Sequence, residues 1–374
     1  MGAPRVPAGD ETVQARAWIA LGASTRPDGD LYRSIRERFG SPASLLEGGA
    51  GGGEHVSDAL IGGARARGCW AAAELDRIHA TGGFAIPFSD PRYPPLLREI
   101  ADPPAWLAWA GEPGDPDAPM IAVVGSRSAS PDGERLARNW ASWLARRGVT
   151  IVSGFAPGID AAAHRGALEG GGRTLAVLGC GLDVTYPRRH RALREEVLRA
   201  GGGLLSEFPM GTEPARWTFP QRNRLISGLS RGVLVVQAAA RSGTAITARL
   251  ALEQGREVWA VPGAPDDPRA RGTNSLIRQG ARLVEEPAEI LADLLPWWPK
   301  ELRRPAPREG GIQAVAGLTE EERNLLSRLG VDRVHIDTIA ARARISVGKA
   351  ATLLLALEIG GQVQRHPGMR FSRG

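Results

Sequence analysis

Six short apolar segments recur through the middle of this 374-residue chain, and segments with helical spacing lie between them. The first, at 120–125, is a near-continuous apolar run, which is typical of a strand buried on both faces of a sheet. Leu136, Trp140 and Leu144 then recur every four residues, as on one face of a helix. Strands that alternate with helices predict an α/β fold, in which helices cover both faces of a mostly parallel sheet. The other predicted strands are 149–152, 175–178, 203–205, 233–236 and 258–261.

The chain on either side of these strands divides into further regions. The N-terminal part has helical spacing, and a Pro- and Arg-rich segment nearer the C-terminus has the composition of a linker. Three short helical segments and a hairpin around Pro367 and Gly368 follow, in the order of a winged helix. The predicted regions are a disordered tail at 1–10, a helical domain at 11–80, a connector or extension of the central domain at 81–118, the central domain at 119–295, a linker at 296–313 and the winged helix at 314–374.

Composition excludes several classes of protein. Hydrophobic residues make up 43% of the chain and charged residues 24%, as in folded rather than disordered chains. No apolar run approaches the roughly 18 residues that span a bilayer, and residues 1–11 lack the apolar core of a secretory signal. The two cysteines, Cys69 and Cys180, are too few for a disulfide framework. We therefore expect a cytoplasmic protein with no membrane partner.

The charge of the chain favours an anionic partner. Lys and Arg total 47 against 41 Asp and Glu, for a net charge of +6, and Lys300 and Lys349 are the only lysines. The guanidinium of arginine keeps its charge and matches the geometry of a phosphate. Genome composition accounts for a preference for arginine over lysine, but it does not account for an excess of cations. Such an excess is typical of proteins that bind nucleic acids.

Glycine-containing turns follow the first two predicted strands. Gly125, Ser126 and Arg127 come directly after the first strand, at the edge where ligands of open parallel sheets bind. Glycine lets the backbone approach a phosphate closely, and the N-terminus of the following helix attracts an anion. By itself, the triplet is equally compatible with an ordinary tight turn between a strand and a helix.

The second turn contains Ser153, Gly154, Phe155 and Gly158, and it leads into a helix. Two phosphate-facing loops side by side form a longer groove, which suits a polymer better than a single nucleotide. Phe155 either stacks on a base in that groove or fills the core beneath it.

Three later segments add polar and cationic groups at the same edge. The run 186–191, which includes Arg188, places cations at a helix start, where they are unfavourable unless an anion binds. Arg222 and Arg224 either reach a phosphate or brace the sheet through carboxylates. A further helix opens with amides and hydroxyls that suit an oxygen anion. The residues of that opening are Ser242, Gly243 and Thr244.

Taken in order over about 120–295, these motifs resemble those of the DprA (Smf) family of DNA-processing proteins. The resemblance implies a Rossmann-like, doubly wound central domain, flanked by an N-terminal helical domain like a sterile alpha motif (SAM-like) and a C-terminal winged helix. The motifs that carry it include Gly125-Ser126-Arg127, Ser153-Gly154, Gly158-Ile159-Asp160, Tyr186-Pro187, Phe219-Pro220, Arg222-Asn223-Arg224 and Ser242-Gly243-Thr244.

The resemblance also implies a function. Members of this family bind single-stranded DNA, protect it from nucleases and load a RecA-type recombinase onto it during natural transformation (competence) and DNA recombination. The implied protein is a homodimer through its Rossmann-like domain, with no catalytic residue, metal or cofactor. The implied DNA site is Gly125, Ser126, Arg127, Ser153, Gly154, Phe155, Gly158 and Arg188; the candidates Arg222, Arg224, Ser242, Gly243 and Thr244 are added from their positions in the sequence.

Two positions depart from the family pattern. Pro157 stands where the loop after Gly154 usually has a cation, so one phosphate contact is missing. Gln237 stands where the strand before Ser242 usually ends in a glutamate, which removes a charge that would oppose DNA.

Two other functions compete with this interpretation. Nucleotide phosphoribohydrolases share the fold superfamily and place a catalytic glutamate just after a glycine-rich loop. After Gly243 and Thr244, however, the first carboxylate is Glu253, more than two helical turns away, so no general acid or base stands beside the loop. The other alternative is an adaptor that holds a recombinase and has no DNA affinity of its own.

The winged helix is expected to contribute little to duplex binding. Its third predicted helix, at 347–359, carries Lys349 against Glu358 and is otherwise apolar. Cations normally supply most of the affinity for a duplex. We therefore expect this region to serve mainly in association with another protein surface.

Overall fold

The computed structural model describes residues 9–48, 56–115, 117–240, 242–294, 320–329, 334–359, 362–366 and 368–373. The chain divides into two compact units, Met1–Pro305 and Ala306–Gly374. The predicted linker at 296–313 and most of the predicted tail lie outside the described residues, although the first helix already begins at Gly9. None of the helices in the described ranges is both long and apolar enough to cross a membrane.

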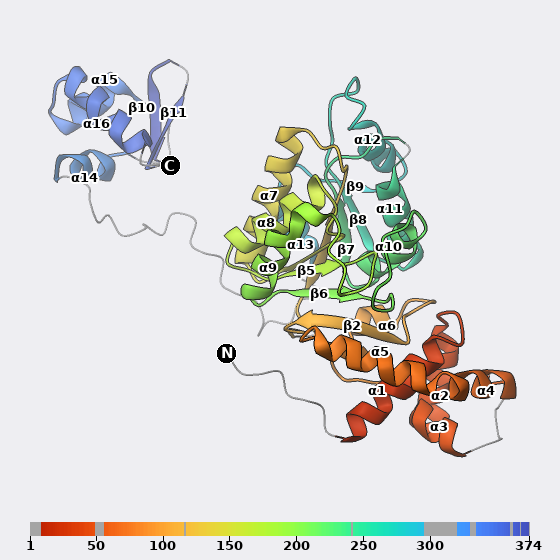
Figure 1. Cartoon of the computed structure of the whole chain (residues 1–374). Helices are drawn as coiled ribbons and strands as arrows, with labels where there is room; N and C mark the ends of the chain where they lie inside the picture. The colour runs from red at the N-terminus through yellow and green to blue at the C-terminus, as the bar shows by residue number, and fades with distance from the viewer. Residues whose placement is uncertain are drawn as a thin grey trace. The chain divides into compact units, whose positions relative to one another are not determined.

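Nine strands among the described residues form one sheet in the first unit, in the order β1-β2-β6-β5-β4-β3-β7-β8-β9 (Figure 1). From β6 to β9 all neighbours are parallel, whereas β2 pairs antiparallel with both β6 and β1. The predicted α/β fold with a mostly parallel sheet is therefore confirmed. The strands are β1 (Phe84–Pro87), β2 (Trp106–Gly111), β3 (Met120–Val124), β4 (Thr150–Ser153), β5 (Thr174–Val177), β6 (Gly203–Ser206), β7 (Gly232–Val235), β8 (Glu257–Ala260) and β9 (Arg282–Leu283).

Successive residues of β3 face opposite sides of the sheet, because side chains alternate along a strand. Ile121 and Val123 pack in one core cluster with residues of α7, α8 and α13. Ala122 and Val124 pack in the other cluster, which includes residues of α10 and α11. The sheet is thus covered on both faces, as a doubly wound fold requires (Figure 1). The helices of this region are α7 (Pro131–Arg146), α8 (Ile159–Glu169), η1 (Arg188–His190), α9 (Arg191–Arg199), α10 (Thr218–Gly228), α11 (Gly243–Glu253), α12 (Arg271–Arg278) and α13 (Pro287–Leu294).

The N-terminal helices share a core with the sheet. One cluster of buried residues runs without a break from Trp18 in the first helix, through Leu75 and Trp109, to Leu205 in β6. The helical part at 11–80 therefore belongs to the same compact unit as the sheet, and the segment at 81–118 supplies two strands to that sheet. The helices are α1 (Gly9–Gly22), α2 (Gly29–Phe39), α3 (Pro42–Gly48), α4 (Asp58–Ala66), α5 (Gly68–Ala80) and α6 (Pro95–Arg98).

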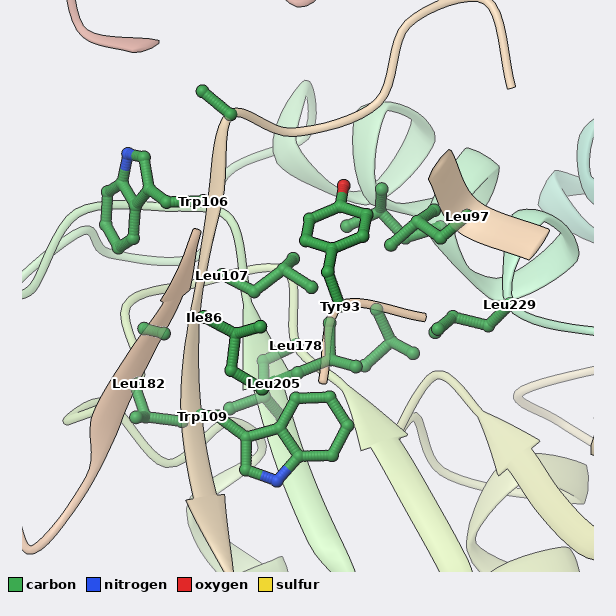
Figure 2. Close-up of a cluster of buried hydrophobic side chains, with 14 of the residues drawn as sticks. Ile86, Tyr93, Leu97, Trp106, Leu107, Trp109, Leu178, Leu182, Leu205 and Leu229 are labelled. Atoms are coloured by element: carbon green, nitrogen blue, oxygen red, sulfur yellow. The ribbon is translucent and has the colours of Figure 1, made fainter. Parts of the chain in front are cut away.

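Strand β2 is central to this shared core. Figure 2 shows Leu107 and Trp109 of β2 among Ile86, Leu178 and Leu205, which come from three other strands or strand ends. Leu107 and Trp109 are almost completely buried. Burial of two large apolar side chains at this junction stabilises the packing of the N-terminal part against the sheet.

The second unit has the architecture of a winged helix, as the sequence predicts. Three helices among its described residues are followed by a hairpin, and the described strands form a sheet in the order β10-β12-β11. Ala350, Leu354 and Leu357 of the third helix are buried in this unit's own core. The elements are α14 (Glu320–Ser327), β10 (Val334–His335), α15 (Ile336–Ala343), α16 (Val347–Ile359), β11 (Val363–His366) and β12 (Arg370–Arg373).

We expect Leu107→Ala to lower the free energy of unfolding by about 2–5 kcal/mol, because it leaves a cavity where the N-terminal part meets the sheet. Near-UV circular dichroism in a urea titration measures the effect. Leu252→Ala is the matched control: Leu252 is 57% exposed, so the expected change stays within about 0.5 kcal/mol. Early, separate unfolding of the N-terminal helices in the wild type would contradict a shared core.

Candidate functional site

A groove of about 630 Å³ lies at the carboxyl end of β3, at the edge where the sequence analysis placed the site. Three arginines and one carboxylate line it, so its charge is positive. Its walls come from the turn after β3, the loop after β4 and the N-terminal ends of α10 and α11. The lining residues that the argument uses are Gly125, Ser126, Arg127, Asp160, Tyr186, Arg216, Phe219, Arg222, Ser242, Gly243 and Thr244.

The first two loops are packed against each other through glycine. A Cβ atom on Gly158 would lie 2.3 Å from the carbonyl oxygen of Ser126, and φ at Gly158 is +76°. A Cβ atom on Gly125 would lie 2.5 Å from Ile159. Side chains larger than hydrogen are therefore excluded at both positions. The two predicted turns are brought side by side, and Ser126 and Arg127 are left at the groove.

Arg127 and two aromatic rings form a cluster in the groove. The guanidinium of Arg127 lies 4.7 Å from the centre of the Phe219 ring. The Phe219 ring lies 5.7 Å from that of Tyr186, which is 42% exposed. Both aromatic residues belong to the family motifs in the sequence, but they were not among the residues predicted for the site. Their positions beside the basic segments 186–191 and 219–224 were the available signal, because aromatic residues interleaved with cations suit nucleotides.

Ser153 and Phe155 do not face the groove. Ser153 is fully buried, and its hydroxyl donates a hydrogen bond of 2.6 Å to the carbonyl of Val123. Phe155 is 1% exposed, and its ring packs edge-on against His164 and His190. Of the two roles considered for Phe155, the structure favours filling the core over stacking on a base. Both residues support the loop from beneath.

Arg222 is buried beneath the groove. It is 3% exposed, and its guanidinium donates to the carbonyl oxygens of Gly154, at 2.6 Å, and of Val177. Burial lowers the pKa of Arg222 to about 10 and raises that of the neighbouring Asp160 to about 6, although each charge favours the other. Arg222 therefore links the loop after β4 to the end of β5 through these two carbonyls, with the carboxylate of Asp160 nearby. Its charge also adds to the positive charge of the groove.

Asp160 is a carboxylate at the groove that the sequence analysis missed as a possible acid or base. It is 7% exposed and accepts a hydrogen bond of 3.3 Å from the backbone amide of Ala156. The nearby His164 is fully buried, pairs with the hydroxyl of Thr174 at 2.7 Å, and has its pKa lowered by burial to about 3. Among the described residues, no group of three or more His, Cys, Asp or Glu side chains could hold a metal ion.

Arg224 braces the sheet and does not line the groove. It is 5% exposed and pairs with Glu207 at 2.5 Å and with Asp102 at 2.9 Å. Both carboxylates already pair with the charge of Arg224. Of the two roles considered for it, the structure therefore favours bracing the sheet over contacting a phosphate. Arg188 is exposed in η1, outside the residues that line the groove.

The N-terminus of α11 forms the opposite wall. Gly243 and Thr244 line the groove, and Ser242 is the N-cap residue of the helix. The hydroxyl oxygen of Ser242 is shielded from solvent and has no hydrogen-bond partner among the described residues. A polar group of this kind is costly to leave unpaired, so it is available to an oxygen of a ligand.

The departure at Gln237 lies outside the groove. Its side chain accepts a hydrogen bond from the amide of Ser130 at 3.0 Å and donates one to the Ser130 hydroxyl at 2.8 Å. Ser130 caps the N-terminus of α7. Glutamine at this position therefore changes the contacts of a helix cap and does not change the charge of the groove lining.

The fold and the groove define a Rossmann-like α/β protein with a positively charged, aromatic-lined cleft and a winged helix as a second unit. The chain matches the family described as DNA recombination-mediator protein A over residues 84–295, and the DprA winged helix domain over residues 306–369. The chain belongs to the DprA family.

Named relatives agree with this assignment. Protein Smf of Escherichia coli K12 is 46% identical over 289 residues, which are 76% of this chain and 75% of that protein. The structure of DprA from Streptococcus pneumoniae is 33% identical with a TM-score of 0.61, and the match covers 74% of this chain and 95% of that one. The structure of DNA processing protein A from Helicobacter pylori, described for its single-stranded DNA binding mode, is 31% identical with a TM-score of 0.50; the match covers 55% of this chain and 94% of that one.

We expect Arg224→Met to destabilise the fold by about 3–5 kcal/mol, because it leaves the buried carboxylate of Glu207 without its partner. Urea denaturation measures this, and the double variant Arg224→Met/Glu207→Gln should regain a large part of the loss. Arg249→Met is the matched control: it breaks an exposed pair with Glu253, which is worth at most about 1 kcal/mol. Equal stability of Arg224→Met and wild type would contradict the bracing role.

Proposed function

We propose that this protein binds single-stranded DNA in the groove, protects it, and passes it to a RecA-type recombinase during natural transformation and DNA recombination, without catalysing a reaction. The observation that carries the proposal is the cluster of Arg127, Phe219 and Tyr186. A cation, the exposed ring of Tyr186 and the half-buried ring of Phe219 in one groove offer a phosphate contact and a base contact within a nucleotide's length.

The same geometry favours a single strand over a duplex. The bases of a duplex are already stacked and paired, whereas an unpaired base can lie against an aromatic ring. Stacking and backbone contacts of this kind tolerate any sequence. The groove offers the exposed guanidiniums of Arg127 and Arg216 with the N-terminus of α11, all of which suit phosphates.

The relatives support the proposal. A DprA structure from another bacterium is described for its single-stranded DNA binding mode, and the family is described as a recombination mediator. We extend both roles to this chain, with the cytoplasm as the compartment where an incoming strand meets a recombinase. We also propose a homodimer through the Rossmann-like domain; its support is the edge strand β9, where Leu283 is 42% exposed.

A hydrolase function is the alternative that the groove must be tested against. Asp160 is the carboxylate among the described lining residues, and it is held by the Ala156 amide and the charge of Arg222. A carboxylate that is held and buried in this way suits a structural role. Incubation with nucleoside monophosphates is expected to release no free base, and release that Asp160→Asn abolishes would establish the hydrolase instead.

The winged helix is proposed to contribute little to DNA affinity. Lys349 on α16 forms an ion pair with Glu321. The charge of Lys349, the cation predicted on this helix, is therefore already paired with a carboxylate of the same unit. We propose that this unit serves mainly in association, either with a second chain or with another protein.

We expect Arg127→Ala to weaken binding of a single-stranded oligothymidine by roughly ten- to a hundredfold, since one charge-assisted phosphate contact is worth about 1.5–3 kcal/mol. Fluorescence anisotropy against a labelled oligonucleotide measures the affinity. The fold should be unaffected, because Arg127 is exposed. The matched control is Arg199→Ala, which removes an exposed arginine that does not line the groove. Wild-type affinity in Arg127→Ala, or tighter binding to duplex DNA, would contradict the proposal.

We expect affinity for single-stranded DNA to rise about fivefold as the pH falls from 7.5 to 5. The pKa of Asp160 is raised to about 6 by burial, so its carboxylate is charged above this pH and neutral below it. Loss of one like charge near the phosphates is worth roughly 1 kcal/mol. His164, with a pKa near 3, stays neutral over this range.

Asp160→Asn is the test of this pH dependence. It should bind as wild type does at low pH and show a nearly flat pH profile. A wild-type affinity that falls with decreasing pH, or a profile that the variant leaves unchanged, would assign the titration to another group.

A further inference from the structure

A second pocket lies beside the groove, on the other side of the loop after β4. Its volume is about 290 Å³. Its charged lining residues come from three elements: Glu134 from α7, Arg165 from α8 and Arg189 from η1. Pro157 and Gly158 of the loop form the side nearest the groove.

The two guanidiniums give this pocket a positive charge that the one carboxylate of its lining, Glu134, offsets only in part. Arg165 and Arg189 are both exposed, and neither has an ion-pair partner among the described residues. His190, also in the lining, has its pKa lowered, first by burial and further by the charges of these two arginines. It is therefore neutral at pH 7, and Glu134 is the acidic group that faces the two cations. The pocket carries a net positive charge.

The pocket and the groove are neighbours on the scale of a nucleotide. A narrow cleft between them shares Arg127, Tyr186 and Phe219 with the groove and Pro157 with the second pocket. From Ala156 at the groove to Gly158 at the pocket is two residues, at most about 7 Å of chain. Phosphates of a stacked strand are about 3.4 Å apart along its axis, so one or two nucleotides cover this distance.

The lining of the pocket suits a phosphate and not a base. None of the described residues that line it offers an exposed aromatic ring or a large aliphatic side chain. Two guanidiniums facing one space form charge-assisted hydrogen bonds with phosphate oxygens. The groove supplies the stacking surface, and this pocket supplies a second point of attachment for the backbone.

We propose that the pocket of Arg165, Arg189 and His190 binds the sugar–phosphate backbone of the same single strand that occupies the groove, so that the strand crosses the loop at Pro157. This inference rests on the proposed function. It explains how the protein holds DNA although the loop itself has proline in place of a cation. It also makes affinity depend on strand length, because a very short oligonucleotide fills the groove alone.

The test compares two oligothymidines, one of about 4 and one of about 16 nucleotides, which span the range of single-strand site sizes. Fluorescence anisotropy is measured across salt concentrations for wild type and for Arg165→Gln/Arg189→Gln. The double variant should bind the long strand about tenfold more weakly and the short strand within about twofold of wild type. The log–log plot of its affinity for the long strand against salt concentration should have a slope that is less negative than that of wild type by about 1.4, which is 0.7 for each of two phosphates.

Two further variants control for charge. Arg38→Gln/Arg199→Gln removes two exposed arginines that line neither pocket and should leave both affinities unchanged. Glu134→Gln should tighten binding of the long strand about twofold, since it removes the acidic group that faces the cations. Unchanged melting temperatures confirm that the variants are folded.

The outcomes separate this inference from the proposed function. If wild type binds neither strand, the proposed function fails. If wild type binds both and Arg127→Ala weakens both, the proposed function stands. The inference is then overturned when Arg165→Gln/Arg189→Gln loses no affinity, loses as much for the short strand as for the long one, or behaves as Arg38→Gln/Arg199→Gln does. Polyglutamate is the second probe. If Arg165→Gln/Arg189→Gln binds polyglutamate more weakly than wild type does and binds DNA equally well, the pocket takes an acidic protein segment and the inference is overturned.

Discussion

The groove depends on one buried guanidinium. Arg222 joins α10 to the carbonyls of Gly154 and Val177, which lie just after β4 and at the end of β5. A buried charge is tolerated only where hydrogen bonds and an opposite charge surround it, so these elements are held in one arrangement. Phe219 lies three residues earlier on α10, and the same contacts therefore position the ring on which Arg127 is stacked.

The basic residues of this edge divide into two groups by their partners. Arg222 and Arg224 are buried and satisfied by carbonyls or carboxylates, so they hold the fold together. Arg127, Arg165 and Arg189 are exposed and lie around the loop after β4. Their positive charge is available to a ligand because none of the three has an ion-pair partner among the described residues, although Glu134 faces Arg165 and Arg189. The same guanidinium group therefore either holds the fold together or is available to a ligand, and its partners decide which.

The N-terminal helices take part in the same construction. Strand β2 pairs antiparallel with β6 and brings α1 and α5 against the sheet, so these helices share one of the two core clusters of the first unit (Figures 1 and 2). Glu74 on α5 is fully buried and accepts a hydrogen bond of 2.6 Å from the amide of Met210, which follows β6. This hydrogen bond joins α5 to the loop after β6. It therefore stabilises the segment that leads to α10, one of the helices that line the groove.

The sequence by itself determined the α/β class, the six central strands and the sheet edge at which the candidate groove lies. Buried parallel strands are nearly continuous apolar runs, and their carboxyl ends meet at one edge, so local patterns suffice. It did not reveal β9, two residues long, or that β1 and β2 continue the sheet, because short strands carry little pattern and their pairing is decided only in the folded chain. Tertiary structure alone decided which groups face the groove. Phe155 and Arg224 are buried, while Phe219 lies against both Arg127 and Tyr186. That outcome depends on partners such as Glu207, 17 residues from Arg224, and His190, 35 residues from Phe155, which meet these residues only in the folded chain.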